Sequence, residues 1–394
     1  MPTPVIGIHD LSIATTHYVL DHATLAHHHG VPVDKYHYGI GQEAMSVPAA
    51  DEDIVTLAAT AAAPILQRHG TDNLRTLLLA TESSVDQSKA SGLYLHPLLG
   101  LPNTCRVLEL KQACYSATAA LQLALGLITR DPAERVLVIA ADIARYDLDT
   151  PAEATQGAAA AAMLITADPA LAALGPITGI HSTDVNDFWR PNYRTTAVVD
   201  GKLSITAYLD AVTHAYTDYR NRGGLPLEEF AAFCYHQPFT KMAYKAHRHL
   251  LAAHDLPTET TDLDRALAAT THYNRVIGNS YTASLYLALA SLLDHTDDLT
   301  GQPIAMISYG SGSVAELFTA TPAPGYQTQL RTTTDIINQR KPIDYHHYRT
   351  LHTTSEPTRD GHLVLPRETA SPYRLAAITN HNRIYETTGH PPTA

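Results

Sequence analysis

Cys114 has the clearest setting for chemistry in this sequence. It is one of three cysteines, and it stands between an apolar run and a segment whose apolar residues recur at helical spacing from Leu121 to Ile128. The spacing predicts a helix that begins near Tyr115 or Ser116. Unpaired N–H groups and the helix dipole stabilise an anion there, so we expect a lowered thiol pKa and a nucleophilic thiolate. A small buried core cysteine is the alternative, and for cysteines in general it is the commoner role.

Two further segments place acid–base groups directly after strand-like runs. Glu82 and Asp86 follow one such run, and His236 follows another. Partial burial at a strand end would raise the pKa of a carboxyl group enough for it to act as a general base. Taken alone, the carboxylates could equally be solvated loop acids, Ser83 or Ser84 could begin a helix as its cap, and one histidine among 23 could be incidental.

A basic helix face and a glycine-rich turn could both meet an anion. Lys241, Lys245 and Arg248 recur at i, i+4 and i+7, so they share one face that could bind phosphate groups. Gly310 and Gly312 permit close backbone approach, and N–H groups in their turn could hold an oxyanion. A solvated basic face and a plain turn are the alternatives, because the turn lacks the lysine and the glycine spacing of a P-loop.

Histidines gather in two places, His27–His29 and the set His346, His347 and His352. No cysteine or carboxylate stands at metal-ligand spacing from either group. We therefore predict solvated surface histidines and no metal site.

The composition of the 394-residue chain opposes several functions. A formal net charge of −12 disfavours sequence-independent binding to nucleic acid. No apolar run approaches the length of a membrane span, and the first residues read as a strand, not as a signal peptide. An odd, sparse set of cysteines predicts a reducing, cytoplasmic location, with Cys105 and Cys234 as structural residues.

Strand-like and helix-like runs alternate along the chain in two series. The first series contains Cys114 and Glu82, and the second contains His236 and the glycine-rich turn. Continuous apolar strands are typical of a sheet that is covered on both faces. The polar tail after Tyr326 is expected to wrap over the surface, with one last strand in residues 373–386.

Three segments taken together resemble one family. "KQACYSATAAL", "ATESSVDQSKA" and "YHQPFTKMAYKA" are similar to the segments that carry the catalytic cysteine, glutamate and histidine of 3-hydroxy-3-methylglutaryl-CoA (HMG-CoA) synthases, and in character the chain resembles the bacterial mevalonate-pathway type. The resemblance extends from about His9 to the last strand. It implies an α/β, thiolase-like fold in which two similar halves, residues 1–168 and 169–394, form a five-layer αβαβα arrangement, and it implies a homodimer.

The resemblance also implies a reaction: acetyl-CoA condenses with acetoacetyl-CoA and water to give HMG-CoA and CoA, with no metal or bound cofactor. Cys114 would carry the acetyl group, Glu82 would remove a proton from its methyl group, and His236 would contact the acetoacetyl ketone. Lys241 and Lys245 would lie near the CoA phosphates. The other implied substrate-binding residues are Tyr146, Thr155, Asp187, Asn279 and Ser311, of which Ser311 would offer its backbone N–H to the oxyanion.

Ser116 leaves open whether the acetoacetyl substrate is a CoA thioester or a thioester of an acyl carrier protein. Glycine or alanine is common in the family at this place, and the serine resembles relatives that install β-branches on polyketide chains held by an acyl carrier protein. The basic face favours free CoA thioesters. The alternatives are a carrier-protein acceptor and a catalytically silent thiolase-fold protein that binds acyl-CoA or acts as a scaffold.

Overall fold

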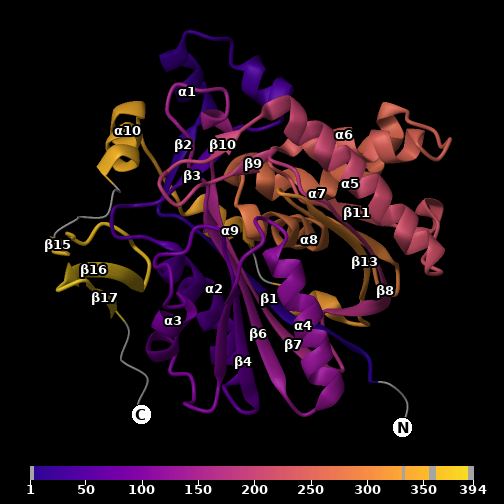
Figure 1. Cartoon of the computed structure of the whole chain (residues 1–394), viewed down its shortest axis with the longest axis horizontal. Coiled ribbons are helices and arrows are strands. Elements are labelled where there is room, and N and C mark those ends of the chain that lie inside the picture. The colour runs from indigo at the N-terminus through magenta and orange to yellow at the C-terminus, as the bar shows by residue number, and fades with distance from the viewer. Residues whose placement is uncertain (1–3, 331–332, 355–360, 389–394) are drawn as a thin grey trace.

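The computed structural model describes residues 4–330, 333–354 and 361–388, and they are built around one mixed β-sheet (Figure 1). Its nine strands run in the order β11-β12-β13-β8-β1-β7-β6-β4-β5. The strands are β1 (Ile6–Thr15), β4 (Leu74–Ala80), β5 (Arg106–Leu110), β6 (Arg135–Ile143), β7 (Ala158–Ala167), β8 (Ala172–Ser182), β11 (Ala232–Tyr235), β12 (Ile304–Gly310) and β13 (Val314–Pro322).

The strand order repeats on the two sides of the sheet. On one side β7 is antiparallel to β1 and β6, and β4 is parallel to β6. On the other side β13 is antiparallel to β8 and β12, and β11 is parallel to β12. Two residue pairs, Gly7–Ala173 and Ile8–Ala172, join β1 to β8. A Cβ on Gly7 would lie 2.1 Å from the carbonyl oxygen of Ala172, so the absence of a side chain permits this junction.

Helices cover both faces of the sheet, which explains its continuous apolar strands. Successive residues of β6 alternate between two apolar clusters: Val136 and Val138 face the cluster that contains α4 (Ser116–Arg130) and α8 (Ser284–Asp294), and Leu137 faces the cluster that contains α2 (Ile54–His69). A third cluster joins α5 (Gly201–Asn221) and α6 (Thr240–Ala252) to β12 and β13. The site elements are therefore held by a core on each side.

The remaining elements surround this core (Figure 1). None of the described helices is long and apolar enough to cross a bilayer. The helices are α1 (His22–His29), α3 (Gly92–Leu98), α7 (Thr260–Ile277), α9 (Thr333–Asn338) and α10 (Tyr345–Thr354), with short turns η1 (Lys35–Ile40), η2 (Glu153–Thr155), η3 (Leu227–Glu229), η4 (Tyr281–Ala283) and η5 (Tyr326–Gln329). The small strands are β2 (Tyr18–Asp21), β3 (Ala44–Val47), β9 (Phe188–Trp189), β10 (Val198–Val199), β14 (Lys341–Pro342), β15 (Leu363–Val364), β16 (Tyr373–Thr379) and β17 (Asn382–Thr387).

The tail forms a hairpin where the sequence predicted one strand. β16 and β17 are joined at Asn380 and His381, which have φ of +48° and +65°. Two positive φ angles in a two-residue turn match the strand twist, and asparagine tolerates this conformation well. The tail packs on the surface as expected: Arg383 donates to the carbonyl oxygen of Val85 at 2.9 Å and lies 3.7 Å from Asp86. Asp86 is thus engaged by Tyr94 of α3 and by the tail.

Candidate active site

Cys114 lies at the N-terminus of α4, as the sequence predicted. The helix begins at Ser116, with Tyr115 in the cap position. The Ser116 hydroxyl accepts from the backbone N–H of Gln112 and donates to the carbonyl oxygen of Ala113, at 2.6 and 2.8 Å. Ser116 therefore shapes the turn that presents the cysteine.

The thiol and a carboxylate meet directly. Sγ of Cys114 donates to Oε1 of Glu82 at 3.0 Å, and Glu82 stands two residues after the end of β4. Burial, with a contribution from the charge of Asp142, raises the pKa of Glu82 to about 8. Burial and the neighbouring Glu82 raise the pKa of the Cys114 thiol. The expected lowering of the thiol pKa is therefore wrong, because desolvation and a facing carboxylate outweigh the helix terminus.

Asp142, on β6, holds the loop that carries Glu82. Its buried carboxylate accepts from the hydroxyl of Thr81 at 2.8 Å, from the backbone N–H of Glu82 at 2.9 Å and from Thr282 of η4 at 3.1 Å. Ser83 also donates to it, so this serine is not a helix cap. Asp142 is not among the site residues predicted from the sequence. The available signal was a carboxylate inside an otherwise apolar strand, which must be hydrogen-bonded if it is buried.

His236 follows β11 directly, as predicted. The hydroxyl of Tyr208 donates to its carbonyl oxygen at 2.8 Å. Burial lowers the pKa of His236 to about 3, so the imidazole is neutral at physiological pH, and its Nδ1 has no hydrogen-bond partner among the described residues. Burial raises the pKa of the Tyr208 phenol, so this hydroxyl stays neutral and remains a donor.

The structure gathers further predicted residues around Cys114. Tyr146 lies in the same apolar cluster as the cysteine and packs edge-on against Tyr281, with ring centroids 6.3 Å apart. Nδ2 of Asn279 donates to the hydroxyl of Tyr146 at 3.2 Å, and the backbone N–H of Asn279 donates to the carbonyl oxygen of Thr155 at 3.0 Å. Residues from distant parts of the chain therefore form one wall.

The glycine-rich turn is the loop of a hairpin between β12 and β13 and closes another side of the site. Asp187 accepts from the hydroxyl of Tyr309 at 2.7 Å and from the backbone N–H of Gly312 at 2.9 Å. The carbonyl oxygen of Ser311 accepts from Nε2 of Gln112, two residues before the nucleophile, at 3.2 Å. The turn is thus attached to the segment that carries Cys114.

Comparisons with known proteins identify the family. Residues 2–170 match the model of the hydroxymethylglutaryl-coenzyme A synthase N terminal region, and residues 174–266 and 256–351 match that of the C terminal region. The chain belongs to the HMG-CoA synthase family. It is 39% identical to the hydroxymethylglutaryl-CoA synthase of Enterococcus faecalis over 386 residues, 96% of this chain and 99% of that protein.

Two further relatives bear on the ligand. A solved HMG-CoA synthase in complex with CoA superposes with a TM-score of 0.92 and 40% identity, covering 97% of this chain and all of the other. The polyketide biosynthesis 3-hydroxy-3-methylglutaryl-ACP synthase of Bacillus subtilis is 34% identical over 313 residues, 74% of each chain. The fold is therefore the α/β, thiolase-like fold of HMG-CoA synthases, with the mixed sheet and flanking helices described above.

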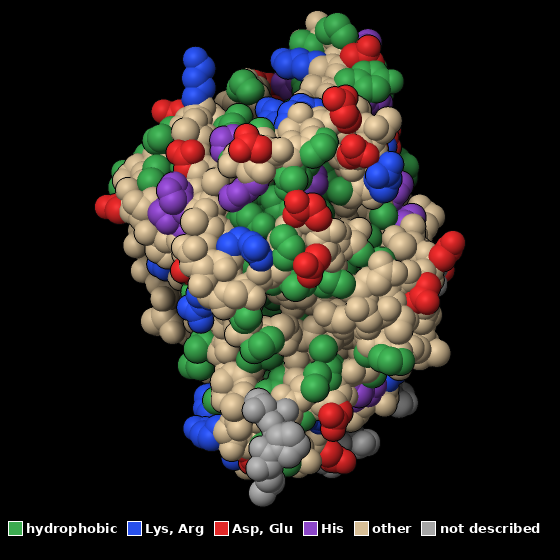
Figure 2. Space-filling view, turned by 90° about the vertical axis from the view of Figure 1, so that its right-hand side faces the viewer, with side chains coloured by type: hydrophobic (Ala, Val, Ile, Leu, Met, Phe, Trp, Pro, Cys, Tyr) green, Lys and Arg blue, Asp and Glu red, His purple; other side chains and the backbone are tan. Residues whose placement is uncertain are grey.

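The basic face of this family member lies on α6. Lys245 and Arg248 are exposed and Lys241 is partly exposed. Nζ of Lys241 and Nζ of Lys245 lie 5.1 and 5.2 Å from the ring centroids of Tyr244 and Phe239. Neither lysine has an acidic partner within the described ranges. Figure 2 shows the side of the molecule to the right in Figure 1, where basic, acidic and histidine side chains are interspersed.

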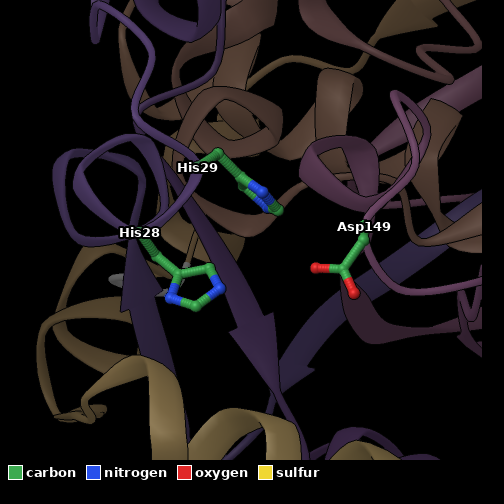
Figure 3. Close-up of side chains that lie close together, drawn as sticks. All are labelled: His28, His29 and Asp149. Atoms are coloured by element: carbon green, nitrogen blue, oxygen red, sulfur yellow. The ribbon is translucent and has the colours of Figure 1, made fainter.

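Two histidines of the first group, His28 and His29, lie close to Asp149, a carboxylate about 120 residues further along the chain. His28, His29 and Asp149 offer ligand atoms that lie within 4.8 Å of one another (Figure 3). Arg349, however, donates to Oδ2 of Asp149 through both terminal nitrogens at 3.1 Å, and Nε2 of His29 lies 3.3 Å from a carboxylate oxygen of Glu153. The Arg349 guanidinium already pairs with the carboxylate that a cation would need.

His352 was predicted to be solvated, and this prediction is wrong. Its Nε2 donates to the carbonyl oxygen of Tyr146 at 2.9 Å, and burial lowers the pKa of His352 to about 4. The histidine therefore supports the wall that contains Tyr146. Cys105 and Cys234 are free and buried, as expected of structural residues.

Proposed function

We propose that this chain is an HMG-CoA synthase, an acyltransferase that condenses acetyl-CoA with acetoacetyl-CoA and water to give HMG-CoA and CoA. The observation that carries the proposal is the 3.0 Å contact between Sγ of Cys114 and Oε1 of Glu82 at the start of α4. A nucleophile with a base within hydrogen-bond reach is the requirement for covalent acyl transfer. Family membership supports the substrate class, and the relative bound to CoA supports CoA thioesters.

Acetyl transfer is the first step. Glu82 accepts the thiol proton of Cys114 as the sulfur attacks the thioester carbonyl of acetyl-CoA. The backbone N–H groups of Cys114 and Ser311 stabilise the tetrahedral oxyanion, and CoA leaves as the thiol after receiving from Glu82 the proton that came from Cys114, which restores the Glu82 carboxylate. Because burial keeps the thiol protonated in the free enzyme, transfer of its proton to the adjacent carboxylate is what makes the sulfur nucleophilic.

Carbon–carbon bond formation is the second step. Glu82 removes a methyl proton from acetyl-Cys114, and the resulting enolate attacks the ketone carbon of acetoacetyl-CoA. The neutral imidazole of His236 faces the ketone oxygen and donates a hydrogen bond as this oxygen becomes an alkoxide. The proton that Glu82 removed ends on this alkoxide, which becomes the 3-hydroxyl group and restores the Glu82 carboxylate. Water then hydrolyses the Cys114 thioester, which regenerates the thiol and releases HMG-CoA with a free carboxylate. No step requires a metal or a bound cofactor.

Substrate positioning uses the surrounding residues. Tyr146, Thr155, Asp187 and Asn279 line the acyl end of the site. The hydrogen bonds of Asn279 to Tyr146 and Thr155 support this arrangement, as do those that Asp187 accepts from Tyr309 and Gly312 in the glycine-rich turn. The exposed lysines of α6 bind the CoA phosphates through charge, which lets an acidic protein hold a polyanion.

One experiment tests which thioester, of CoA or of a carrier protein, supplies the acetoacetyl group. Purified protein is given acetyl-CoA with either acetoacetyl-CoA or acetoacetyl carrier protein, and the product is quantified by mass spectrometry. We expect turnover with the CoA thioester, which fits a mevalonate-pathway enzyme that makes isoprenoid precursors. Turnover with the carrier protein alone would assign the chain to polyketide β-branching, a reaction type present among its relatives. Turnover with neither, by folded protein, would overturn the enzyme assignment.

We further propose that the chain comprises two similar halves, residues 1–168 and 169–394, in a five-layer αβαβα arrangement. The repeated strand order on each side of the β1–β8 junction supports this division, since residue 168 falls between β7 and β8. The helices α4 and α8 in the cluster between the outer clusters support a central helical layer.

A homodimer is supported by the edge strand β5. Leu108 on this strand, Leu93 on α3 and Leu123 on α4 are 47%, 45% and 52% exposed, on elements that contact one another. An unpaired edge strand with apolar side chains is a surface suited to pairing with a second copy. Sedimentation should show a dimer and Leu108→Asp should shift it towards monomer; a monomeric wild-type protein would refute the proposal.

The three free thiols support a cytoplasmic location.

A further inference from the structure

The β9–β10 hairpin lies over the candidate active site and contacts several of its walls. At its base, Asp187 is tied to Tyr309 and to the backbone of Gly312. The ring of Phe188 packs edge-on against Tyr146, with centroids 5.9 Å apart, and it borders the apolar cluster that contains Cys114. The hairpin is therefore in place to influence both the nucleophile and the base.

Arg190 is the residue of this hairpin that reaches the base. It stands directly after β9, and its Nη2 donates to the carbonyl oxygen of Glu82 at 2.7 Å. The sequence separation is 108 residues, so this contact exists only in the folded chain. The contact fixes the carbonyl group of Glu82, and Asp142 holds the N–H group of the same residue.

Building on the proposed function, we propose that Arg190 is a positioning residue for the condensation step: its guanidinium clamps the backbone of Glu82 and keeps a positive charge beside the general base. No covalent step involves Arg190. Its effect is carried through Glu82, which abstracts the methyl proton.

The electrostatic surroundings of Glu82 agree with this role. Burial and the charge of Asp142 on β6 raise the pKa of Glu82, while the Cys114 hydrogen bond and the Arg190 charge lower it. Tyr146 and Tyr281 also face the carboxylate, and burial raises the pKa of both phenols, so they stay neutral. Once Cys114 carries an acetyl group, its hydrogen bond to Glu82 is gone. Arg190 is then the favourable charge that remains among these groups.

Arg194 provides a matched control within the same hairpin. Its Nη2 donates to Oδ2 of Asp147 at 3.0 Å, so it too anchors the hairpin through an ion pair, but it does not contact Glu82. Arg190 and Arg194 are both exposed, so substitutions at either position do not disturb the core. A change that follows from general loosening of the hairpin should appear in variants of both arginines.

The experiment compares Arg190→Gln, Arg190→Lys and Arg194→Gln with the wild type. The acetyl-enzyme is mixed with saturating acetoacetyl-CoA, and single-turnover rates are measured from pH 6 to pH 9.5. The positive charge of Arg190 favours the ionised form of Glu82, so its removal raises the pKa of Glu82. In Arg190→Gln the rising part of the plot of rate against pH should therefore move to higher pH by about 0.5–1 unit. At pH 7 this corresponds to a rate about threefold to tenfold lower, with recovery at high pH. Arg190→Lys should restore most of the shift, and Arg194→Gln should show none.

The outcomes are separable from those of the proposed function. A wild-type protein without turnover refutes the function itself. If the wild type turns over and Arg190→Gln keeps the wild-type pH profile, Arg190 has no role in tuning the base. Equal shifts in Arg190→Gln and Arg194→Gln would assign the effect to hairpin integrity and would also overturn the inference.

Discussion

The pH dependence of the condensation step is the sharpest consequence of the site geometry. Glu82 must be ionised to remove the methyl proton from acetyl-Cys114, yet burial raises its pKa to about 8. The rate of this step should therefore rise with pH through the neutral range. The imidazole of His236, with a pKa of about 3, stays neutral across this range, so its ionisation does not change the rate between pH 7 and pH 9.

The magnitude follows from the ionised fraction of Glu82. For a group with a pKa of 8, this fraction is about 0.1 at pH 7, about 0.5 at pH 8 and about 0.9 at pH 9, so the rate should rise about tenfold from pH 7 to pH 9. Acetylation of Cys114 removes a hydrogen bond that lowers the pKa of Glu82. The midpoint in the acetyl-enzyme should consequently lie at pH 8 or above.

The assay isolates this step from acetyl transfer. Protein acetylated on Cys114 is mixed with acetoacetyl-CoA, quenched rapidly, and analysed for HMG-CoA by chromatography. Glu82→Gln keeps the shape of the side chain but also slows acetyl transfer, so its acetylation is followed by mass spectrometry to completion before mixing. The condensation rate of this acetylated variant should be lower by about 10²–10⁴, and its residual rate should not follow the ionisation of Glu82. A wild-type rate that is flat between pH 7 and pH 9, or that falls, would refute the assignment of Glu82 as the base.

Three further outcomes are expected. Gly278→Ala should lower the free energy of unfolding by about 3 kcal/mol, because the new Cβ would lie 1.9 Å from a backbone oxygen and the residue has φ of +86°. Gly126→Ala, in open space on α4, should raise it by about 0.5–1 kcal/mol. Similar urea midpoints for the two variants would contradict this contrast. Lys241→Ala and Lys245→Ala should raise KM for CoA thioesters at low salt, and the difference in KM between each variant and the wild type should shrink near about 1 M salt. A KM that does not depend on salt would show that these lysines do not bind the CoA phosphates. Asp53→Ala should cost about 1–2 kcal/mol in the same unfolding assay, because the carboxylate accepts two backbone N–H groups at the start of α2; an unchanged midpoint would show that the cap contributes nothing.

Local patterns in the sequence were enough to predict where the reactive groups stand. Cys114 precedes α4, Glu82 follows β4, and His236 follows β11, because strand ends and helix starts are encoded by the spacing of apolar residues and by turn residues close by. The basic face of α6 is local in the same sense, since three residues at helical spacing must share a side. These predictions needed no knowledge of distant contacts.

The tertiary structure decided what those groups can do. Asp142 lies in an apolar strand and gives no local sign that it binds the Glu82 loop, and Arg190 reaches the same loop from 108 residues away. The pKa of Cys114 rises where a helix terminus alone would lower it, because burial and the facing Glu82 act more strongly than the dipole. Desolvation and charge–charge contact depend on which atoms surround a group in space, and chain folding brings those atoms from remote positions, so a linear reading of the residues cannot supply them.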